Sequence, residues 1–253
     1  MGGYASQFGQ DGFLDRFIFR GLRDGVFIDV GAHDGELFSN SVFFERERGW
    51  TGLCIEPNPP VFQRLRRARR AVCIECCVAP TAGEVEFIQV IGDSEMLSGV
   101  RESYAPEHLA RLREEEALNG STHRVIKVPA RPLRDLLAQQ SIEEVHLLSA
   151  DTEGGEADSL AALNFDRVFI HVIVVENNYR GNAINSALAR PGFVPLIRLG
   201  VDTVYLNRLS PFASRWTRAQ CIGLRALARA ERKLRRLSIL PRGAAAFPYK
   251  APR

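Results

Sequence analysis

The stretch VFIDVGAHDG at residues 26–35 contains the strongest indication of the fold. It begins as a short apolar run typical of a buried strand and ends in a bend with two glycines four residues apart. A second apolar run, 52–55, ends in the acid Glu56. A strand, a glycine-rich bend, a helix and an acid at the tip of the next strand are typical of a nucleotide-cofactor site in an open α/β sheet.

The rest of the chain continues this alternation of strands and helices. Further strands are expected at 71–78, 145–148 and 168–175, with a hairpin partner at 85–90 and a closing antiparallel hairpin at 193–197 and 203–206. Helices are expected near 8–20, 36–48, 59–70, 105–118, 132–137, 156–162 and 181–189. This order predicts one doubly wound sheet within a single domain at 1–210.

The charge of the chain is divided unevenly. Residues 211–253 contain 11 Lys or Arg and one acid, Glu231, which leaves a net charge of −7 on the other 210 residues. An acidic body with a basic tail argues against specific nucleic-acid binding. The tail at 211–253 is expected to hold a basic amphipathic helix, which could lie on an anionic membrane, dock a partner or pack on the acidic body.

The cellular location is expected to be the cytoplasm, with peripheral membrane contact through the tail as an alternative. No run approaches the roughly 18 apolar residues of a membrane span, and the start lacks a signal-peptide pattern. Residues 1–6 match the short N-myristoylation pattern, which a basic patch could reinforce. The five cysteines have no regular spacing, so reduced, unliganded thiols are expected in preference to a zinc site at Cys73 and Cys76.

Four acids each lie at or just past the end of an expected strand. They are Asp29, Glu56, Asp151 and Glu176. Helix capping would account for one or two of them, but not for four at successive strand tips. Because strand tips in such a sheet meet at one edge, the four acids are expected to border one crevice.

The spacing of the glycines favours one cofactor over another. A dinucleotide site needs G-x-G-x-x-G, whereas this chain has Gly31-x-x-x-Gly35 with Asp29, Asp34 and Glu36 around it. These acids would repel a pyrophosphate and would suit a cationic centre. S-adenosylmethionine has such a centre, and Glu56 is placed to accept hydrogen bonds from its ribose hydroxyls.

Several blocks, in order, resemble the FkbM family of S-adenosylmethionine-dependent methyltransferases over about residues 4–207. They are SQFGQD at 6–11, FIDVGAHDG at 27–35, SN at 39–40, GW-x-G at 49–52, EPNP at 56–59, SG at 98–99, LSADTEGGE at 148–156 and VENNY at 175–179. The resemblance implies a Rossmann-like methyltransferase fold, with a mostly parallel seven-stranded sheet, helices on both faces and a reversed last hairpin. It also implies O-methylation of a hydroxyl on a sugar, glycan or natural-product-like small molecule.

The resemblance also implies roles for individual residues. The cofactor would be bound by Asp29, Gly31, Ala32, Gly35, Glu56, Asn58, Cys77 and Val78. The catalytic acids Asp151, Glu153 and Glu176 would lie beside the transferring methyl group. Three residues are expected to contact the acceptor: His33, Met96 and Asn177. His33 departs from the Asn or Tyr that is common in the family, as do Ala150 and Gly155 from larger residues, and these changes point to an altered acceptor shape.

The chemistry expected at this site is proton removal from an acceptor hydroxyl. A neutral alcohol is a weak nucleophile, so Asp151 or Glu153 is expected to act as general base. The same acids could hold Mg²⁺, which is the less favoured alternative, and no metal site is assigned. The insertion at 91–125 is the expected acceptor lid. His33 and His108 are the candidate site residues among the five histidines, although His108 lies on a polar helix, which favours an exposed position.

Two other functions remain alternatives at this point. A nicotinamide oxidoreductase could use a similar sheet, although the third glycine of its motif is missing. A protein that keeps the cofactor fold could also work as a binding module through its basic tail.

Overall fold

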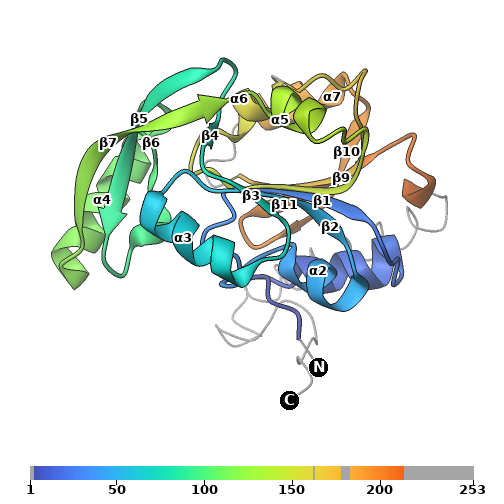
Figure 1. Cartoon of the computed structure of the whole chain (residues 1–253), viewed down its shortest axis with the longest axis horizontal. Helices are drawn as coiled ribbons and strands as arrows, with labels where there is room; N and C mark the ends of the chain where they lie inside the picture. The colour runs from blue at the N-terminus through green and yellow to red at the C-terminus, as the bar shows by residue number, and fades with distance from the viewer. Residues whose placement is uncertain (1–2, 162, 178–182, 214–253) are drawn as a thin grey trace, which may run out of the picture.

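The computed structural model describes residues 3–161, 163–177 and 183–213 (Figure 1). The expected tail helix, Cys221, Asn178 and Tyr179 lie outside the described residues, as do the first two residues of the acylation pattern. Within the described ranges, no helix combines the length and apolar character needed to cross a membrane.

The main sheet has seven strands in the order β10-β11-β9-β8-β1-β2-β3. Its strands are β1 (Val26–Val30), β2 (Thr51–Ile55), β3 (Val72–Ile74), β8 (Glu144–Ala150), β9 (Phe169–Glu176), β10 (Phe193–Leu199) and β11 (Asp202–Asn207). Only β11 runs antiparallel to its neighbours, between β9 and β10. The predicted parallel sheet with a reversed last hairpin is therefore confirmed.

The central strands of this sheet are buried on both faces, as their continuous apolar sequences require. Helices cover each face (Figure 1). On one side lie α1 (Gln10–Phe13), the π-helix Leu14–Phe19, α2 (Val42–Arg48) and α3 (Pro59–Ala68). On the other lie α5 (Leu133–Gln139), α6 (Glu156–Ala161) and α7 (Ala183–Ala189). Two apolar cores result, one around Phe44 and Trp50 and the other around Leu136 and Ile173.

A second sheet forms a lid beside the main one, in the order β4-β7-β5-β6. Its strands are β4 (Cys77–Val78), β5 (Gly83–Ile91), β6 (Gly99–Val100) and β7 (Thr122–Arg131). The 3₁₀ turns Glu95–Leu97 and Arg101–Ser103 and helix α4 (Pro106–Asn119) complete it. We refer to residues 77–131 as the lid.

The lid corrects two sequence-based predictions. The strand expected at 71–78 is divided into β3 and β4, which belong to different sheets. Strand β7 was not predicted, because Pro129 weakens its strand pattern and its first residues are exposed. It pairs with β5 over nine residues and makes the lid a sheet in its own right, not a loop insertion.

Candidate active site

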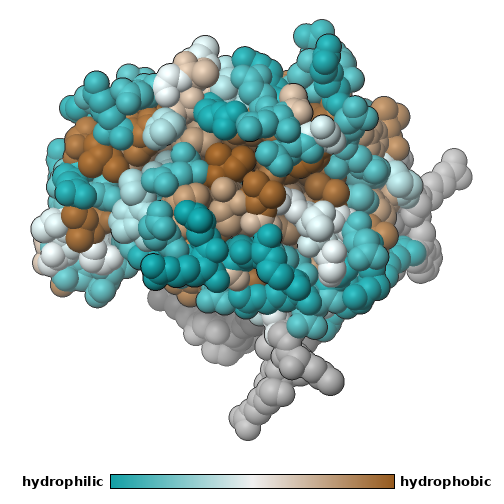
Figure 2. All heavy atoms as spheres, in the orientation of Figure 1, coloured by the Kyte–Doolittle hydropathy of each residue, from teal (hydrophilic) through white to brown (hydrophobic). Residues whose placement is uncertain are grey.

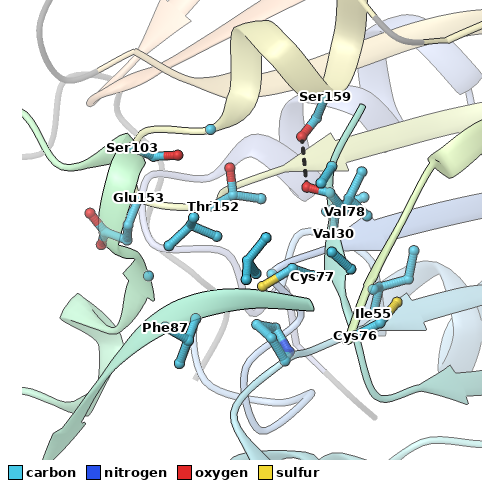
Figure 3. A pocket seen from close by; sticks show the side chains of 18 of the residues that line it. Val30, Ile55, Cys76, Cys77, Val78, Phe87, Ser103, Thr152, Glu153 and Ser159 are labelled. Carbon is cyan, nitrogen blue, oxygen red and sulfur yellow. Dashed lines mark hydrogen bonds between the residues drawn. The ribbon is translucent and has the colours of Figure 1, made fainter. Parts of the chain in front are cut away.

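A cavity of about 640 Å³ lies between the carboxyl edge of the main sheet and the lid. Figure 2 shows hydrophobic residues gathered between the two sheets, with hydrophilic residues around them. Figure 3 shows the apolar part of the wall, which comes from both sheets: Val30, Ile55, Cys76, Cys77, Val78 and Phe87. Strand tips of an open α/β sheet are the usual place for a ligand.

The glycine bend forms the floor of this cavity. The backbone amides of Gly31 and Ala32 both donate to the carbonyl of Ile55, at 2.9 and 3.0 Å. Gly31 has a φ of 77°, and a Cβ atom there would lie 1.7 Å from the carbonyl oxygen of Asp151. The first glycine is therefore required both for its left-handed backbone and for the close approach of the loop that follows β8.

Glu56 is fixed at the tip of β2 by the backbone around it. Its carboxylate accepts hydrogen bonds from the amides of His33, at 3.0 Å, and Asn58, at 2.8 Å. Asn58 in turn accepts a hydrogen bond from Gln89 of the lid. Burial raises the pKa of Glu56 to about 7, and the two amide hydrogen bonds oppose this shift. A carboxyl group held in this way in the cavity wall can accept further hydrogen bonds from a ligand's hydroxyls.

Asp29 does not line the cavity. Its side chain is buried behind the glycine bend and accepts hydrogen bonds from Ser39 and Ser41, with Arg69 at 4.0 Å. Arg69 also pairs with the buried Glu45 and lies against Gly35. Here Asp29 supports the bend from the helix side, and direct contacts of Asp29, Ala32 and Gly35 with a cofactor stay predictions.

The three predicted catalytic acids form one cluster. Ligand oxygens of Asp151, Glu153 and Glu176 lie within 4.8 Å of one another, close enough to share a proton or to hold a divalent cation. Burial and mutual repulsion raise the pKa of Glu153 and of Glu176 to about 8. The pKa of Asp151 is also raised by burial and by Glu176. Because Asp151 is exposed to the water of the cavity, its full shift is expected only when a ligand fills the space.

Shared protons are the simpler way to accommodate the cluster. Asp151 and Glu176 are hydrogen-bonded to each other, which requires a proton on one of the two carboxyl groups. Glu176 and Asn177 do not line the cavity, whereas Asp151 and Glu153 do. Asp151 and Glu153 are thus the two acids placed to meet an acceptor.

The loop between β8 and α6 is held by Glu156. Its carboxylate accepts hydrogen bonds from the amides of Thr152, at 2.9 Å, and Gly154, at 3.0 Å. Glu156 therefore orients the loop that carries Asp151 and Glu153. Glu153 itself has a φ of 56°, which is unusual for a residue with a side chain and is typical of functional loops.

Of the three residues predicted to contact the acceptor, two line the cavity and one does not. His33 lines the cavity, and its Nε2 atom lies 3.1 Å from Glu95 of the lid. Met96 also lines the cavity and is partly exposed. Asn177 lies outside the lining, and its backbone carbonyl accepts a hydrogen bond from Arg198.

His108 is one of the two histidines that the sequence offered as site residues, but its burial was not predicted. It was expected to be exposed, yet only 1% of its side chain is exposed and its Nδ1 atom lies 3.3 Å from Glu153. The helix that carries it has no clear apolar face, so its pattern gave no signal that this position points inward. Its role depends on the packing of the lid against the loop after β8.

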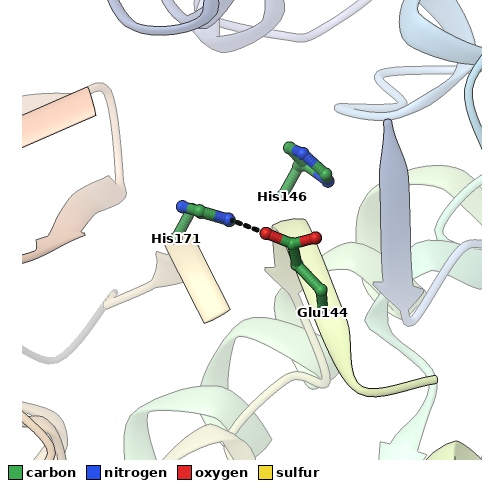
Figure 4. A group of neighbouring side chains, drawn as sticks. All are labelled: Glu144, His146 and His171. Carbon is green, nitrogen blue, oxygen red and sulfur yellow. Dashed lines mark hydrogen bonds and ion pairs between the residues drawn. The ribbon is translucent and has the colours of Figure 1, made fainter. Parts of the chain in front are cut away.

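A second group of polar residues lies at the opposite edge of the sheet, at the amino ends of β8 and β9 (Figure 4). His171 lies 2.9 Å from Glu144 through Nε2 and 2.9 Å from Ser210 through Nδ1. His146 accepts a hydrogen bond from the amide of Val26 through Nδ1, so the other nitrogen of its neutral ring carries the hydrogen. Hydrogen bonds within the protein therefore occupy this group, which is remote from the cavity.

The charge of the cavity wall is one-sided. Among the described residues, seven acids and no Lys or Arg line it. The acids are Glu56, Glu84, Glu95, Glu102, Asp151, Glu153 and Asp158. A phosphate-bearing dinucleotide would find no cation here, whereas a positively charged ligand would be stabilised.

The raised pKa values of these carboxyl groups predict how stability depends on pH. A carboxyl group whose pKa is higher in the folded than in the unfolded protein stabilises the fold while protonated, and this contribution is lost as pH rises. For Glu153 and Glu176 the loss extends from about pH 4.5 to about pH 8. The melting temperature of the ligand-free protein is therefore expected to fall by several degrees between pH 6.5 and 8.5.

The double variant Glu153→Gln/Glu176→Gln should flatten this decline, as measured by calorimetry. The exposed Glu107→Gln on α4 is the matched control and should keep the wild-type slope. A wild-type melting temperature that is constant over this range would contradict the proposed protonation of the cluster.

The strand order, the single reversed strand β11 and the cavity at the carboxyl edge define a Rossmann-like fold of the methyltransferase class. The family model described as "Methyltransferase FkbM domain" matches residues 29–196. The chain belongs to this family, as its sequence blocks predicted. No curated protein matches it significantly.

Solved structures with a similar arrangement have low sequence identity to the chain. An FkbM methyltransferase from Methylobacillus flagellatus KT is 14% identical with a TM-score of 0.44, over 72% of this chain and 43% of its own. A TehB-like SAM-dependent methyltransferase from Corynebacterium glutamicum ATCC 13032 Kitasato is 11% identical with a TM-score of 0.41, over 80% and 89%. A precorrin-6y C5,15-methyltransferase from Geobacter metallireducens GS-15 is 14% identical with a TM-score of 0.39, over 81% and 95%. The chain thus spans less than half of the Methylobacillus protein.

Proposed function

We propose that this protein is an S-adenosylmethionine-dependent O-methyltransferase that acts on a hydroxyl of a small molecule or glycan. The observation that carries the proposal is the cavity wall with seven acids and, among the described residues, no Lys or Arg. When bound, the cofactor supplies a methyl group on a cationic sulfur, which such a wall stabilises. The family to which the chain belongs supports the same chemistry.

The residues present fit the parts of this cofactor. Glu56, fixed by two backbone amides, can accept hydrogen bonds from ribose hydroxyls. The apolar wall of Ile55, Cys77 and Val78 suits the faces of an adenine ring. Gly31 brings the loop after β8 close to the bend, so that Asp151 and Glu153 border the same space.

Glu153 is the residue best placed to take the proton of the acceptor hydroxyl. It lines the cavity, whereas Glu176 lies behind Asp151 and is hydrogen-bonded to it. A general base works best when its pKa is near the working pH, and burial raises the pKa of Glu153 to about 8. Asp151 faces the same cavity, and a positive centre beside it would oppose the rise that burial and Glu176 cause in its pKa.

The direct test is binding of S-adenosylhomocysteine, the product that remains after transfer. We expect isothermal titration to show one site per chain and Glu56→Gln to weaken the affinity about 10- to 100-fold, since hydrogen bonds to a charged group contribute roughly 1.5–3 kcal/mol. The exposed Glu143→Gln is the matched control and should bind as the wild type does.

Absence of binding by the wild type would refute the proposed function, and tight binding of NADH instead would support the oxidoreductase alternative. A screen of sugar and polyketide alcohols for methyl transfer from labelled S-adenosylmethionine would then identify the acceptor. If the protein binds S-adenosylhomocysteine but transfers a methyl group to none of these alcohols, the result would favour the binding-module alternative.

A further inference from the structure

His108 and Glu153 meet at the contact between the lid and the main sheet. His108 lies in the first turns of α4, and Glu153 lies in the loop after β8. Their exposed side-chain fractions are 1% and 14%, and Nδ1 of His108 lies 3.3 Å from Oε2 of Glu153. Figure 3 shows Glu153 on the side of the cavity where Ser103 of the lid also lies.

The hydrogen positions in this pair follow from its neighbours. The Nε2 atom of His108 lies 3.2 Å from the carbonyl oxygen of Leu97, which can only accept, so Nε2 carries a hydrogen. In the neutral ring Nδ1 is then an acceptor. Nδ1 of His108 and Oε2 of Glu153 are both shielded from water and have no hydrogen-bond partner. Two bare acceptors at this distance repel each other, whereas a single proton between them would satisfy both.

We propose that His108 is a positioning residue that shares one proton with Glu153, through Nδ1 and Oε2, and receives that proton when Glu153 takes the proton of the acceptor hydroxyl. The inference rests on the proposed function, because it assigns the destination of the proton in that reaction. It assigns a function to a buried histidine that has no role in the proposed binding of the cofactor.

The transfer is balanced in atoms and charge. The acceptor oxygen bonds to the methyl group as the methyl–sulfur bond breaks, and its proton moves to the free oxygen of Glu153. The proton on Oε2 moves at the same time to Nδ1, which leaves a neutral carboxylic acid and an imidazolium. The positive charge lost from sulfur is therefore regained on His108. After the products leave, Nδ1 returns its proton to Oε2 as the cavity-facing oxygen of Glu153 releases its proton to water.

The charges around the pair support this sharing. The groups that face Glu153 are Asp151 from the end of β8, Glu156 from α6 and Arg111 from α4, and Glu176 from β9 senses Glu153 in turn. Arg111 and Glu156 also act on His108, in opposite directions. Burial raises the pKa of Glu153 to about 8 and lowers the pKa of His108. The resting proton is therefore on the carboxyl group, where the relay needs it.

The packing of the lid holds the imidazole in place. Tyr104 lies against the ring of His108 with their centroids 4.1 Å apart. The Tyr104 hydroxyl donates to the same carbonyl of Leu97 that accepts from His108. The ring orientation is thus fixed by two lid residues, Leu97 and Tyr104.

The first test needs neither cofactor nor acceptor. Histidine labelled with ¹⁵N would be followed by long-range ¹H–¹⁵N NMR from pH 6 to 9, and His108 assigned by the signal lost in His108→Asn. We expect His108 as the Nε2–H form, with an Nδ1 shift that changes with a midpoint near pH 8 as Glu153 loses the shared proton. Glu153→Gln should remove this step. A His108 signal with no such step, or a step that remains in Glu153→Gln, would overturn the proposal.

The second test separates a relay from a merely structural role. With the acceptor found in the screen, His108→Asn is expected to lower the single-turnover rate about 10- to 100-fold at pH 7 and to recover most of the rate at pH 9, where Glu153 is ionised without help. The exposed His123→Asn should keep the wild-type profile. An equal loss at every pH would mean that His108 only packs the lid. An NMR step in a protein that transfers no methyl group would uphold the shared proton and refute the proposed function.

Discussion

Glu153→Gln is expected to lower the rate of methyl transfer about 10²- to 10⁴-fold, which is the usual contribution of a general base. Glutamine keeps the size of the side chain and can donate a hydrogen bond toward His108, but it cannot take a proton from the acceptor. Glu56 and Glu153 both line the cavity, and the proposed function assigns the ribose to Glu56 and the acceptor to Glu153, so the affinity for S-adenosylhomocysteine should change by no more than about twofold.

Single-turnover rates and isothermal titration together would check this expectation. Glu114→Gln, on the exposed part of α4, is the matched control and should keep the wild-type rate. If Glu153→Gln retains full activity while Asp151→Asn loses it, then Asp151 is the base and the role of Glu153 is wrong.

Gly31→Ala is expected to have the largest effect on stability. The new methyl group would overlap the carbonyl oxygen of Asp151, which lies 1.7 Å from the Cβ position. The residue would also be held at a φ of 77°, which costs about 1–2 kcal/mol for a residue with a side chain. Together these effects should exceed about 4 kcal/mol and lower the melting temperature by roughly 10 °C or more. Cofactor binding should be lost as the loop after β8 is displaced.

Gly21→Ala separates the two contributions. Gly21 has the same φ of 77°, yet a Cβ atom there would meet nothing within 4 Å. It should therefore show only the backbone cost, about 1–2 kcal/mol, in the same thermal unfolding experiment. Equal losses in the two variants would mean that the bend and the loop after β8 can move apart.

The sequence predicted the main sheet because its strands are apolar runs buried on both faces, and their tips are marked by polar residues. The glycine bend, Glu56 and the acids after β8 were found in this way, and their shared cavity confirms that they lie together. The lid was harder to predict. Strand β7 is half exposed and contains Pro129, so its pairing with β5 depends on a contact between segments that are distant in the sequence.

Sequence spacing also did not predict where the side chains of two site residues lie. Asp29 lies next to the bend in sequence, but strand alternation turns its side chain to the opposite face, where Arg69 and two serines meet it. His108 lies far from Glu153 in sequence, and only the docking of α4 brings the two together. Sequence spacing indicates which residues share a strand tip, but not which side chains a separate sheet places against them.

Strand β4 couples the lid to the wall of the cavity, because its two residues belong to both. Cys77 and Val78 pair with Ala130 and Arg131 of β7 in the lid, while their side chains border the cavity. Val78 is also held from the other side, since its carbonyl accepts a hydrogen bond from Ser159 of α6 (Figure 3). A chimaera designed to exchange acceptor specificity between relatives should therefore contain the whole segment from residue 75 to residue 131. A graft that begins after β4 would separate Cys77 and Val78 from β7, the strand with which they pair.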